Sequence, residues 1–253
     1  MSHWTWAAAS SRGTSHARSG ERRQDAIACS TPVGKHSPLI AVLCDGAGSA
    51  QMGGKGASLV ARIVASRARE RYRAALGTPP DAVVSSWVTE ARDHVVRAAA
   101  KRDLSARDFA ATMICLISDG TETVVAHVGD GAVVLQNAGD KAWHVIAWPS
   151  HGEYASTTYF VTDEPHPKLI LYRRSEAISA VVAFTDGLER LALDFGAGQA
   201  HAPFFQGILG PVVGSEIAGR DHKLCVALAR YLESDAVNAR TDDDKTLLVA
   251  AYR

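Results

Sequence analysis

Two long helical patterns follow one another in a chain whose other apolar segments are short. Apolar residues recur at helical spacing from Val60 to Ala75 and again from Val84 to Ala98, and Asp81 is a candidate N-cap of the second helix. Strand-length apolar runs stand before and after this pair. Because the helices are segregated from the strands, the order predicts an α+β fold rather than an alternating βαβ fold. Two stacked antiparallel sheets with helices outside would bury both helical stripes.

The predicted strands are apolar, β-branched runs bounded by turn residues. We also expect a glycine-rich loop at 46–56, a hairpin turn at 118–121, a surface flap at 149–167 and a helix at 216–233. The expected strands are Trp4–Ser10, Asp25–Ser30, Leu39–Cys44, Phe109–Ile117, Thr123–Val128, Ala132–Gln136, Trp143–Ala147, Leu169–Tyr172, Ile178–Phe184 and Thr246–Tyr252.

Composition narrows the classes of protein that fit. The chain has 253 residues, enough to bury a core, and we expect residues 1–253 to form one domain. Acidic and basic residues number 27 each, so net charge gives no argument for binding nucleic acid or an anionic membrane. The local basic segment Arg67–Arg73 lies in a helical pattern and is expected to be a solvated face.

The cysteines and the N-terminus indicate a reducing compartment. The four cysteines are far apart and form no C-x-x-C pair, so buried reduced thiols are expected. The N-terminus lacks the basic and apolar regions of a signal peptide, and no apolar run has the length of a membrane span. We expect a cytoplasmic monomer that binds neither nucleic acid nor a membrane.

Aspartates follow several of the predicted strands directly. Asp45-Gly46, Asp130-Gly131 and Asp186-Gly187 each end an apolar run, Asp25 opens one, and the cluster 242–244 precedes the last. Carboxylates that meet at one edge of a sheet repel one another unless a cation lies between them. Oxygen ligands alone select hard cations such as Mg²⁺ and Mn²⁺. The pattern predicts a metal site, although any single Asp-Gly pair is also a common turn, as Asp119-Gly120 is expected to be.

Six short segments, most of them built around an aspartate, span most of the chain from residue 24 to residue 246. The segments are Q-D-A at 24–26, C-D-G-A-G-S-A at 44–50 with G-x-x-A-S at 54–58, F-A-A-T-M at 109–113, H-V-G-D-G-A at 127–132, A-F-T-D-G-L at 183–188 and D-D-K-T at 243–246. Together they resemble the motifs of the protein phosphatase 2C family, especially its bacterial branch, and they occur in that family's order.

The resemblance implies a fold, a ligand set and a reaction. The fold would be a four-layer α-β-β-α sandwich with two central antiparallel sheets. Two Mn²⁺ or Mg²⁺ ions would be held by Asp45, the Gly46 carbonyl, Asp186 and Asp243, with Asp25 at the metal edge through water. A third, weaker ion would lie at Asp130 and Asp186. Water activated by the two ions would hydrolyse phosphoserine or phosphothreonine in proteins, with Asp25, Asp45, Asp186 and Asp243 as catalytic residues.

The chain departs from the family pattern at three positions. Ala47 stands where eukaryotic relatives often have a histidine that acts as general acid, so water would protonate the leaving group. Gly20 stands where the family has a phosphate-binding arginine, which leaves three nearby arginines and a loop histidine as candidate substrate-binding residues. Asp244 stands at the place of the usual Asn. The candidate substrate-binding residues are Arg18, Arg22, Arg23 and His16.

Three readings of the function remain open at this point. The first is an active Ser/Thr phosphoprotein phosphatase, with a cognate Ser/Thr kinase as a partner implied by the resemblance. The second is a catalytically weak module that binds a regulatory partner, and the third is a phosphatase of a small phosphorylated metabolite. His151 and His166 lie in the predicted flap and are expected to be ordinary loop histidines. The sequence matches neither a P-loop nor a dinucleotide fingerprint.

Overall fold

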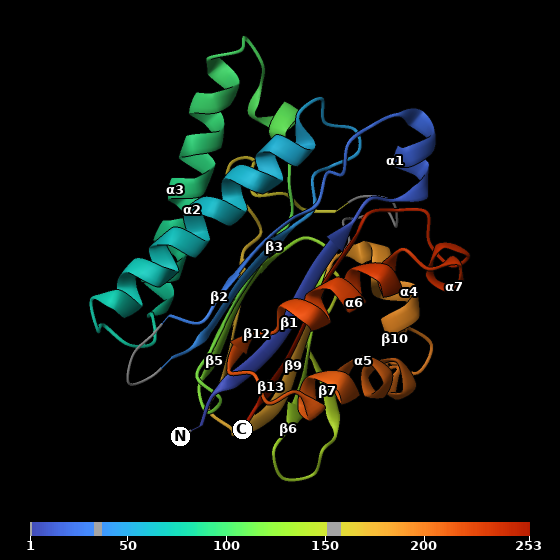
Figure 1. Ribbon diagram of the computed structural model, residues 1–253. Coiled ribbons are helices and arrows are strands. Elements are labelled where there is room, and N and C mark those ends of the chain that lie inside the picture. The colour runs from blue at the N-terminus through green and yellow to red at the C-terminus, as the bar shows by residue number, and fades with distance from the viewer. Residues whose placement is uncertain (1, 33–36, 151–157) are drawn as a thin grey trace.

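Two sheets stacked face to face form the centre of the protein, and helices cover both outer faces (Figure 1). The computed structural model describes residues 2–32, 37–150 and 158–253. Within these residues the prediction of an α+β, four-layer α-β-β-α sandwich is confirmed. That residues 1–253 form one domain stays a prediction.

The first sheet has the strand order β12-β1-β13-β9-β6-β7. All neighbours in it run antiparallel except the short β12, which lies parallel to β1. The strands are β1 (Trp4–Ser11), β6 (Ala132–Asn137), β7 (Trp143–Ala147), β9 (Ile178–Phe184), β12 (Gly219–Arg220) and β13 (Lys245–Tyr252).

The second sheet is antiparallel throughout, with the order β2-β3-β4-β5-β8. Its strands are β2 (Ala26–Ser30), β3 (Leu39–Cys44), β4 (Met113–Ser118), β5 (Thr123–Val128) and β8 (Ile170–Arg174). A separate two-stranded ribbon pairs β10 (Leu193–Asp194) with β11 (Gln199–Ala200).

The helices are distributed over the two outer faces and the loops between strands. The described α-helices are α1 (Thr14–Ser19), α2 (Gly53–Arg73), α3 (Asp81–Ala100), α4 (Glu189–Ala192), α5 (Ala202–Gly214), α6 (His222–Leu232) and α7 (Asp235–Asn238). Two 3₁₀ turns, η1 (Ala106–Phe109) and η2 (Asp186–Leu188), stand beside the strand ends.

Three apolar layers hold the sandwich together. Val60 and Trp87 belong to the layer between helices α2 and α3 and the second sheet. Leu43 and Leu248 belong to the layer between the two sheets, and Phe205 belongs to the layer between the first sheet and helices α5 and α6. Apolar burial is the main favourable term in folding, so these layers fix how the strand ends are placed relative to one another.

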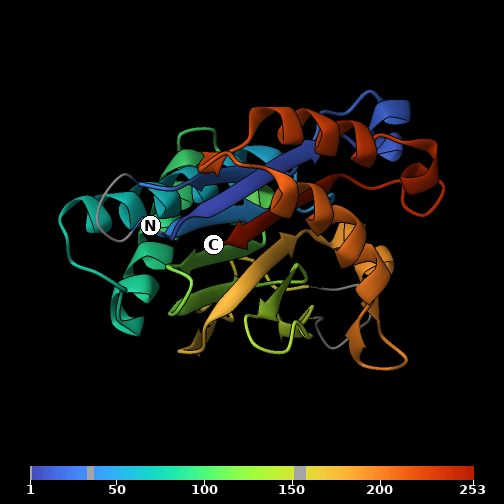
Figure 2. The ribbon, with the colours of Figure 1, turned by 60° about the horizontal axis from the view of Figure 1, so that its bottom comes forward.

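The first and last strands of the chain are neighbours. Figure 2 shows the blue β1 beside the red β13, with both chain ends at the same end of the pair. The backbone groups of His3 and Arg253 exchange two hydrogen bonds, at 2.6 and 3.0 Å. At the other end of the pair, Ser10 and Thr246 lie opposite one another, close to the predicted metal residues.

Both predicted long helices exist, with two differences at their beginnings. Helix α2 begins at Gly53, inside the segment predicted as a glycine-rich loop, because Lys55 and Gly56 donate backbone N–H groups to the Met52 carbonyl. Helix α3 has Pro80, not Asp81, at its N-cap. Proline has no N–H to leave unpaired, and Asp81 instead binds Arg173 at 2.6 Å.

The prediction of a helix over 216–233 is wrong at its start. The helix begins only after Asp221, whose carboxylate accepts the N–H groups of Lys223 and Leu224 at 2.9 and 3.1 Å. Gly219 has φ +82°, a left-handed conformation that ends any continuous helix there. The predicted strand from Phe109 was also too long, because residues 106–109 form η1 and β4 begins at Met113.

The hairpin between β4 and β5 forms as predicted. Its turn is fixed by Asp119, whose carboxylate accepts the N–H groups of Thr121 and Glu122 at 2.9 and 2.8 Å. Asp119-Gly120 is therefore a structural turn, as expected.

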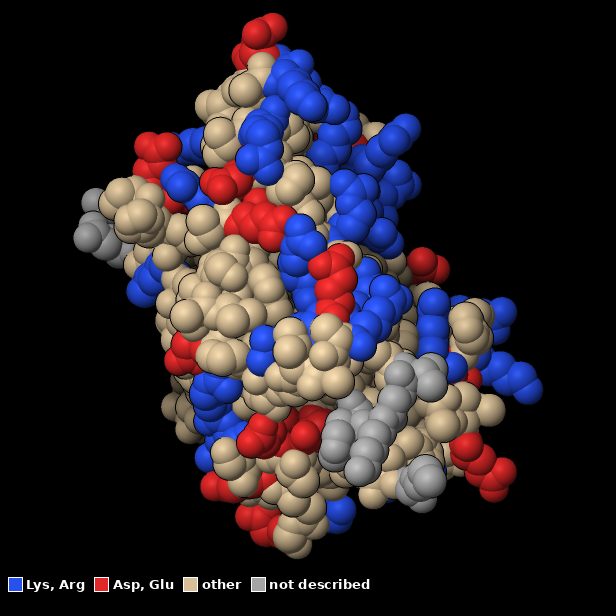
Figure 3. Space-filling view, turned by 90° about the vertical axis from the view of Figure 1, so that its left-hand side faces the viewer, with Lys and Arg blue, Asp and Glu red and all other residues tan. Residues whose placement is uncertain are grey.

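Basic side chains gather on the face that carries α2 and α3 (Figure 3). Several of them are engaged within the protein. Arg67 binds Glu70 and Glu90, each at 2.6 Å, and Arg71 donates to the Gly77 carbonyl at 2.8 Å. Within Arg67–Arg73, Arg67 is thus ion-paired and Arg71 is bound to backbone carbonyls, while Arg73 is exposed.

The cysteine thiols are free. Cys44, Cys115 and Cys225 are buried and Cys29 is half-buried. None of the helices in the described part of the chain has the length and apolar character that a membrane crossing requires.

Candidate metal centre

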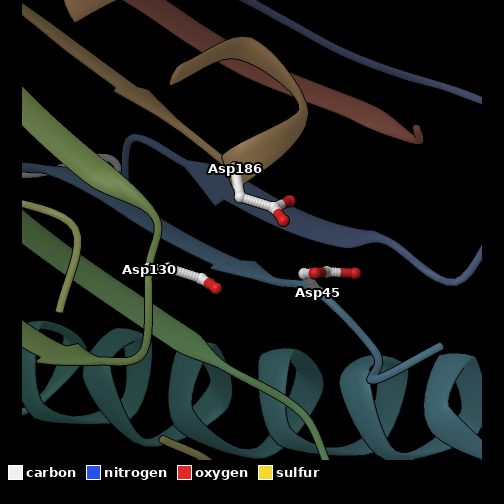
Figure 4. A group of neighbouring side chains, drawn as sticks. All are labelled: Asp45, Asp130 and Asp186. Carbon is white, nitrogen blue, oxygen red and sulfur yellow. The ribbon is translucent and has the colours of Figure 1, made fainter. Parts of the chain in front are cut away.

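Three carboxylates meet where strands of both sheets end (Figure 4). One oxygen each of Asp45, Asp130 and Asp186 lie within 4.8 Å of one another. Asp45 follows β3 of the second sheet, Asp186 follows β9 of the first, and Asp130 lies in the connection from β5 to β6. The site therefore spans the joint between the two sheets.

Backbone contacts hold the Asp45 segment against the beginning of β4. The Asp45 N–H donates to Thr112 Oγ1 at 3.0 Å, and the Thr112 N–H donates to the Asp45 carbonyl at 2.8 Å. Gly129, just before Asp130, packs on the same threonine. It has φ +103°, and a Cβ there would lie 2.6 Å from Thr112 Cγ2, so only glycine fits. Thr112 thus anchors both aspartates.

Asp25 lies behind Asp45 and is buried, with 3% of its surface exposed. Its Oδ2 accepts hydrogen bonds from the hydroxyls of Thr185 at 2.8 Å and Thr246 at 2.6 Å. These threonines neighbour Asp186 and Asp244, and sequence reasoning did not single them out. The signal that would have found them is their place in T-D-G and D-K-T, where a hydroxyl flanks each motif aspartate.

The buried carboxylates of this group are stabilised when they bind protons or cations. Burial, and then the charges of Asp25 and Asp186, raise the pKa of Asp45 well above its ordinary value. Burial followed by the charges of Asp130 and Asp243 raises the pKa of Asp186 in the same way. Burial raises the pKa of Asp25 to about 6, against the opposing hydrogen bonds from Thr246 and Thr185. The ionised carboxylates are therefore unfavourable by themselves, and a hard divalent cation bound between them would stabilise them.

The carboxylates open into a cleft of about 1040 Å³. Asp45, Asp130 and Asp186 line it together with Gly46, Asp243 and His16. Asp243 is exposed and, among the described residues, stands outside the tight group of three. All of the predicted ligands except Asp25 thus reach one cleft, and Asp25 contacts it through Asp45.

Gly46 is packed so closely that its position demands glycine. A Cβ there would lie 2.2 Å from the backbone carbon of Gly53. Gly46 also forms a β-bridge with Ala111. The side-chain amide of Gln24 reaches the carbonyl oxygens of Gly46 and Ala47 at 2.8 and 3.1 Å, with its nitrogen as donor. The backbone carbonyl predicted as a ligand is therefore held in place from two sides.

Asp244 is a buried anchor of the N-terminal segment. Its carboxylate accepts the backbone N–H groups of Gly13 at 2.6 Å and Gln24 at 2.5 Å. His16 Nδ1 lies 3.0 Å from Asp244 Oδ1. Because its oxygens are occupied this way, and because it does not line the cleft, Asp244 supports the site rather than facing it.

The predicted substrate-binding arginines are engaged elsewhere or face solvent. Arg18 binds Asp242 at 3.0 Å, and Arg23 donates to the carbonyls of Ser10 and Asp25 at 2.6 and 3.1 Å. Arg22 is exposed. None of the three lines the cleft, whereas His16 does.

The described part of the predicted flap is built into the cleft wall rather than lying only on the surface. Val161 is fully buried and donates its N–H to the Ala111 carbonyl at 2.9 Å. Phe160 and Glu164, on either side of it, line the cleft. His166 is exposed and His151 lies outside the described residues.

The chain matches known protein phosphatases along most of its length. Residues 12–233 match a family model described as Protein phosphatase 2C. Serine/threonine-protein phosphatase 3 of Escherichia coli (strain K12) is 33% identical over 252 residues, which cover 98% of both chains.

Two solved structures share the fold. A bacterial serine phosphatase has a TM-score of 0.66 at 16% identity, with 98% of each chain covered. The catalytic domain of the serine threonine protein phosphatase PstP, in complex with two manganese ions, has a TM-score of 0.64 at 17% identity, with 100% of this chain and 99% of that one covered. At these identities the likeness concerns the fold. Together with the family match, it confirms the prediction drawn from the six motifs: the chain belongs to the protein phosphatase 2C family.

Proposed function

We propose that this protein is a metal-dependent phosphatase that hydrolyses phosphoserine and phosphothreonine in proteins. The observation that carries the proposal is the convergence of Asp45, Asp130 and Asp186 within 4.8 Å at the base of an open cleft. An oxygen-only donor set of this kind suits Mn²⁺ and Mg²⁺. Burial, and then the neighbouring carboxylate charges, raise the pKa values of Asp45 and Asp186, and this fits the same reading because a bound cation would stabilise the ionised carboxylates against both effects.

Each predicted ligand has a place in this proposal. Asp45 with the Gly46 carbonyl, Asp186 and Asp243 would hold two ions, and Asp130 with Asp186 would hold a third, weaker one. Bound there, the ions lower the pKa of a water and neutralise phosphoryl oxygens. The count of two ions, or of three, is part of the proposal.

The remaining residues orient the reacting groups. Asp25, held by the hydroxyls of Thr185 and Thr246, fixes the back of Asp45 and, as the family resemblance implies, would act at the metal edge through a water. His16 faces the cleft from α1, braced by Asp244, and contacts the phosphoryl or leaving group. In hydrolysis, water attacks phosphorus and the bond to the seryl or threonyl oxygen breaks. That oxygen then takes up a proton, which water supplies because Ala47 carries no acidic group.

The size and openness of the cleft favour a protein substrate. Phosphorylated proteins are the substrates that the family relationship implies, and a cleft of about 1040 Å³ accommodates a phosphorylated side chain with its neighbouring backbone. From the family resemblance we also propose a cognate Ser/Thr kinase, a cytoplasmic location and a monomeric state.

The test is hydrolysis of a phosphothreonine peptide and of p-nitrophenyl phosphate with Mn²⁺, with Mg²⁺ and with EDTA. Asp45→Asn and Asp186→Asn should each lower metal-dependent turnover by roughly 100-fold or more, because they remove ligand charge at nearly constant shape. Asp119→Asn is the matched control, since Asp119 is in an Asp-Gly turn outside the cleft. No turnover with either metal from folded wild-type protein would overturn the proposal and favour the regulatory binding module. Hydrolysis of p-nitrophenyl phosphate but of no phosphopeptide would favour a small-metabolite substrate.

A further inference from the structure

Arg107 is the single lysine or arginine among the described residues that line the cleft. It lies in η1, and its side chain is exposed. Within the described part of the chain its guanidinium has neither an ion pair nor a hydrogen bond. Other arginines near the cleft are different: Arg18 binds Asp242, and Arg92 lies 3.9 Å from Glu164.

The segment that carries Arg107 is clamped to the loop that carries the metal ligands. The Ala47 N–H donates to the Ala110 carbonyl at 2.9 Å, and the Met52 N–H donates to the Asp108 carbonyl at 2.7 Å. The reciprocal hydrogen bonds between Asp45 and Thr112 join the same two segments. Arg107 is thus held at a fixed place relative to Asp45, although the two are far apart in the sequence.

The turn itself is rigid. Asp108 accepts hydrogen bonds from both the N–H and the hydroxyl of Ser105, at 2.9 and 2.7 Å, which forms a capping box around Arg107. Phe109, the next residue, is buried. Gly56 of α2 lies so close to this turn that a Cβ would be only 1.9 Å from the Phe109 carbonyl oxygen. A preorganised backbone reduces the entropy lost when the arginine side chain binds a ligand.

The Arg107 guanidinium lines the same cleft as the metal-site carboxylates and is free to bind an anionic ligand there. Arginine has five N–H donors in a planar fork that matches the oxygens of a phosphoryl group. Among the described residues that line the cleft, a phosphoryl dianion meets four metal-site aspartates and a single guanidinium. With cations bound at the aspartates, the guanidinium could donate to phosphoryl oxygens that the cations leave free, beside the contact proposed for His16.

We propose that Arg107 binds the phosphoryl group of the substrate, and likewise the inorganic phosphate that hydrolysis releases. The inference rests on the proposed function. It concerns recognition of the phosphoryl group itself rather than of the surrounding peptide.

The experiment compares wild type, Arg107→Ala and Arg107→Lys, all loaded with Mn²⁺. Arg107→Ala should raise both the KM for p-nitrophenyl phosphate and the inhibition constant of inorganic phosphate about tenfold, with a smaller change in kcat. Arg107→Lys should recover part of the loss, because it keeps the charge but not the planar fork. Arg62→Ala, an exposed arginine of α2 away from the cleft, is the matched control and should resemble wild type.

Three other results would overturn the inference or separate it from the proposed function. Unchanged constants in Arg107→Ala would overturn the inference while leaving the proposed function intact. A change confined to phosphopeptides, with p-nitrophenyl phosphate and phosphate unaffected, would also overturn it, because Arg107 would then recognise the peptide. If wild type has no turnover, the proposed function fails, and a calorimetric titration of the Mn²⁺-loaded proteins with phosphate decides the inference: weaker binding by Arg107→Ala supports it and equal or absent binding overturns it.

Discussion

His16 Nδ1 lies 3.0 Å from the Oδ1 of Asp244, and this pair joins α1, in the N-terminal segment, to the residues just before β13 at the side of the cleft. The same carboxylate holds the backbone of Gly13 and Gln24. Residues 11–23, which are rich in glycine, serine and arginine and contain α1, are thereby fixed beside the start of strand β13.

Removing the Asp244 carboxylate should destabilise the protein strongly. Asp244→Ala leaves the buried N–H groups of Gly13 and Gln24 without an acceptor, and we expect it to lower the free energy of unfolding by about 2–5 kcal/mol. Asp244→Asn keeps one acceptor oxygen and should cost less. Urea unfolding monitored by tryptophan fluorescence measures both. If Asp244→Ala is as stable as wild type, Asp244 is not the anchor described above.

The His16 imidazole should titrate above its ordinary range. Burial lowers the pKa of His16, but the hydrogen bond and charge of Asp244 outweigh it and raise the pKa above 6.5. An NMR pH titration of the metal-free protein should show this, and Asp244→Asn should shift the His16 pKa downwards. Equal pKa values in the two proteins would contradict the pairing.

The metal-free protein should become more stable when one carboxylate of the cluster is neutralised. Asp45→Asn removes a charge that is desolvated and repelled by Asp25 and Asp186, so it should stabilise the metal-free fold by at least about 1 kcal/mol, or about 2–4 °C in Tm. The same substitution should abolish most of the Tm increase that Mn²⁺ causes in wild type. Differential scanning calorimetry with and without Mn²⁺ tests both effects. A lower Tm for metal-free Asp45→Asn would mean that the carboxylate is stabilised by contacts we have not identified.

The stability of the metal-free protein should fall as pH rises through the neutral range. Asp25, with a pKa of about 6, and Asp45 and Asp186, with pKa values raised well above normal, bind more protons when folded than when unfolded. Their contribution is complete below the unfolded aspartate pKa of about 4 and is lost as pH rises through the folded values. Tm should therefore decline from about pH 6 to pH 8, and Mn²⁺ should remove the decline because it replaces the protons.

The contribution of His127 to stability has the opposite pH dependence. It is buried, and burial lowers its pKa to about 4, so the folded protein holds it neutral. Its contribution is complete above the unfolded histidine pKa of about 6.5 and is lost as pH falls towards the folded value. Because the His127 contribution is nearly complete above about pH 6.5, it cannot offset the predicted decline, and a metal-free Tm that rises steadily from pH 6 to pH 8 would contradict the assignment of raised pKa values to the aspartates.

Adding one methyl group to Gly56 should disturb the cleft. In Gly56→Ala the new Cβ would meet the Phe109 carbonyl, which cannot move without displacing η1, so a loss of about 2–4 kcal/mol and weaker substrate binding are expected. Gly207→Ala in α5 is the matched control. Nothing lies within 4 Å of its Cβ, and alanine favours the helix by about 0.5–1 kcal/mol. Thermal unfolding of the two variants should therefore shift in opposite directions.

The sequence predicts elements well where one face is apolar and the other is not. Helices α2 and α3 have such stripes, and both were found. Helix α5 was missed because Pro203, Pro211 and several glycines are signals of turns, while the helix is stabilised by burial of residues such as Phe205 against the first sheet. In α5, burial against the neighbouring sheet outweighs the low helix propensity of proline and glycine.

The residues of the site also divide into those that the sequence predicts and those that it does not. The aspartates could be found because each lies at one end of a strand within a recognisable motif, and rigid strand ends bring them together. Arg107 could not be found in this way. It lies in a short 3₁₀ turn with no motif, and it reaches the cleft only because backbone contacts join its segment to residues 45–52. Proximity created by the tertiary fold leaves no local signal in the sequence.

The adjacent chain ends also decide how the protein can be attached to other molecules. His3 and Arg253 pair at one end of β1 and β13, while the cleft opens at the other, about 25 Å away for strands of this length. An affinity tag, a surface tether or a second domain joined at either end would extend from the side remote from the aspartates. The catalytic end would stay exposed, so that even an immobilised copy could meet a substrate as bulky as a folded protein.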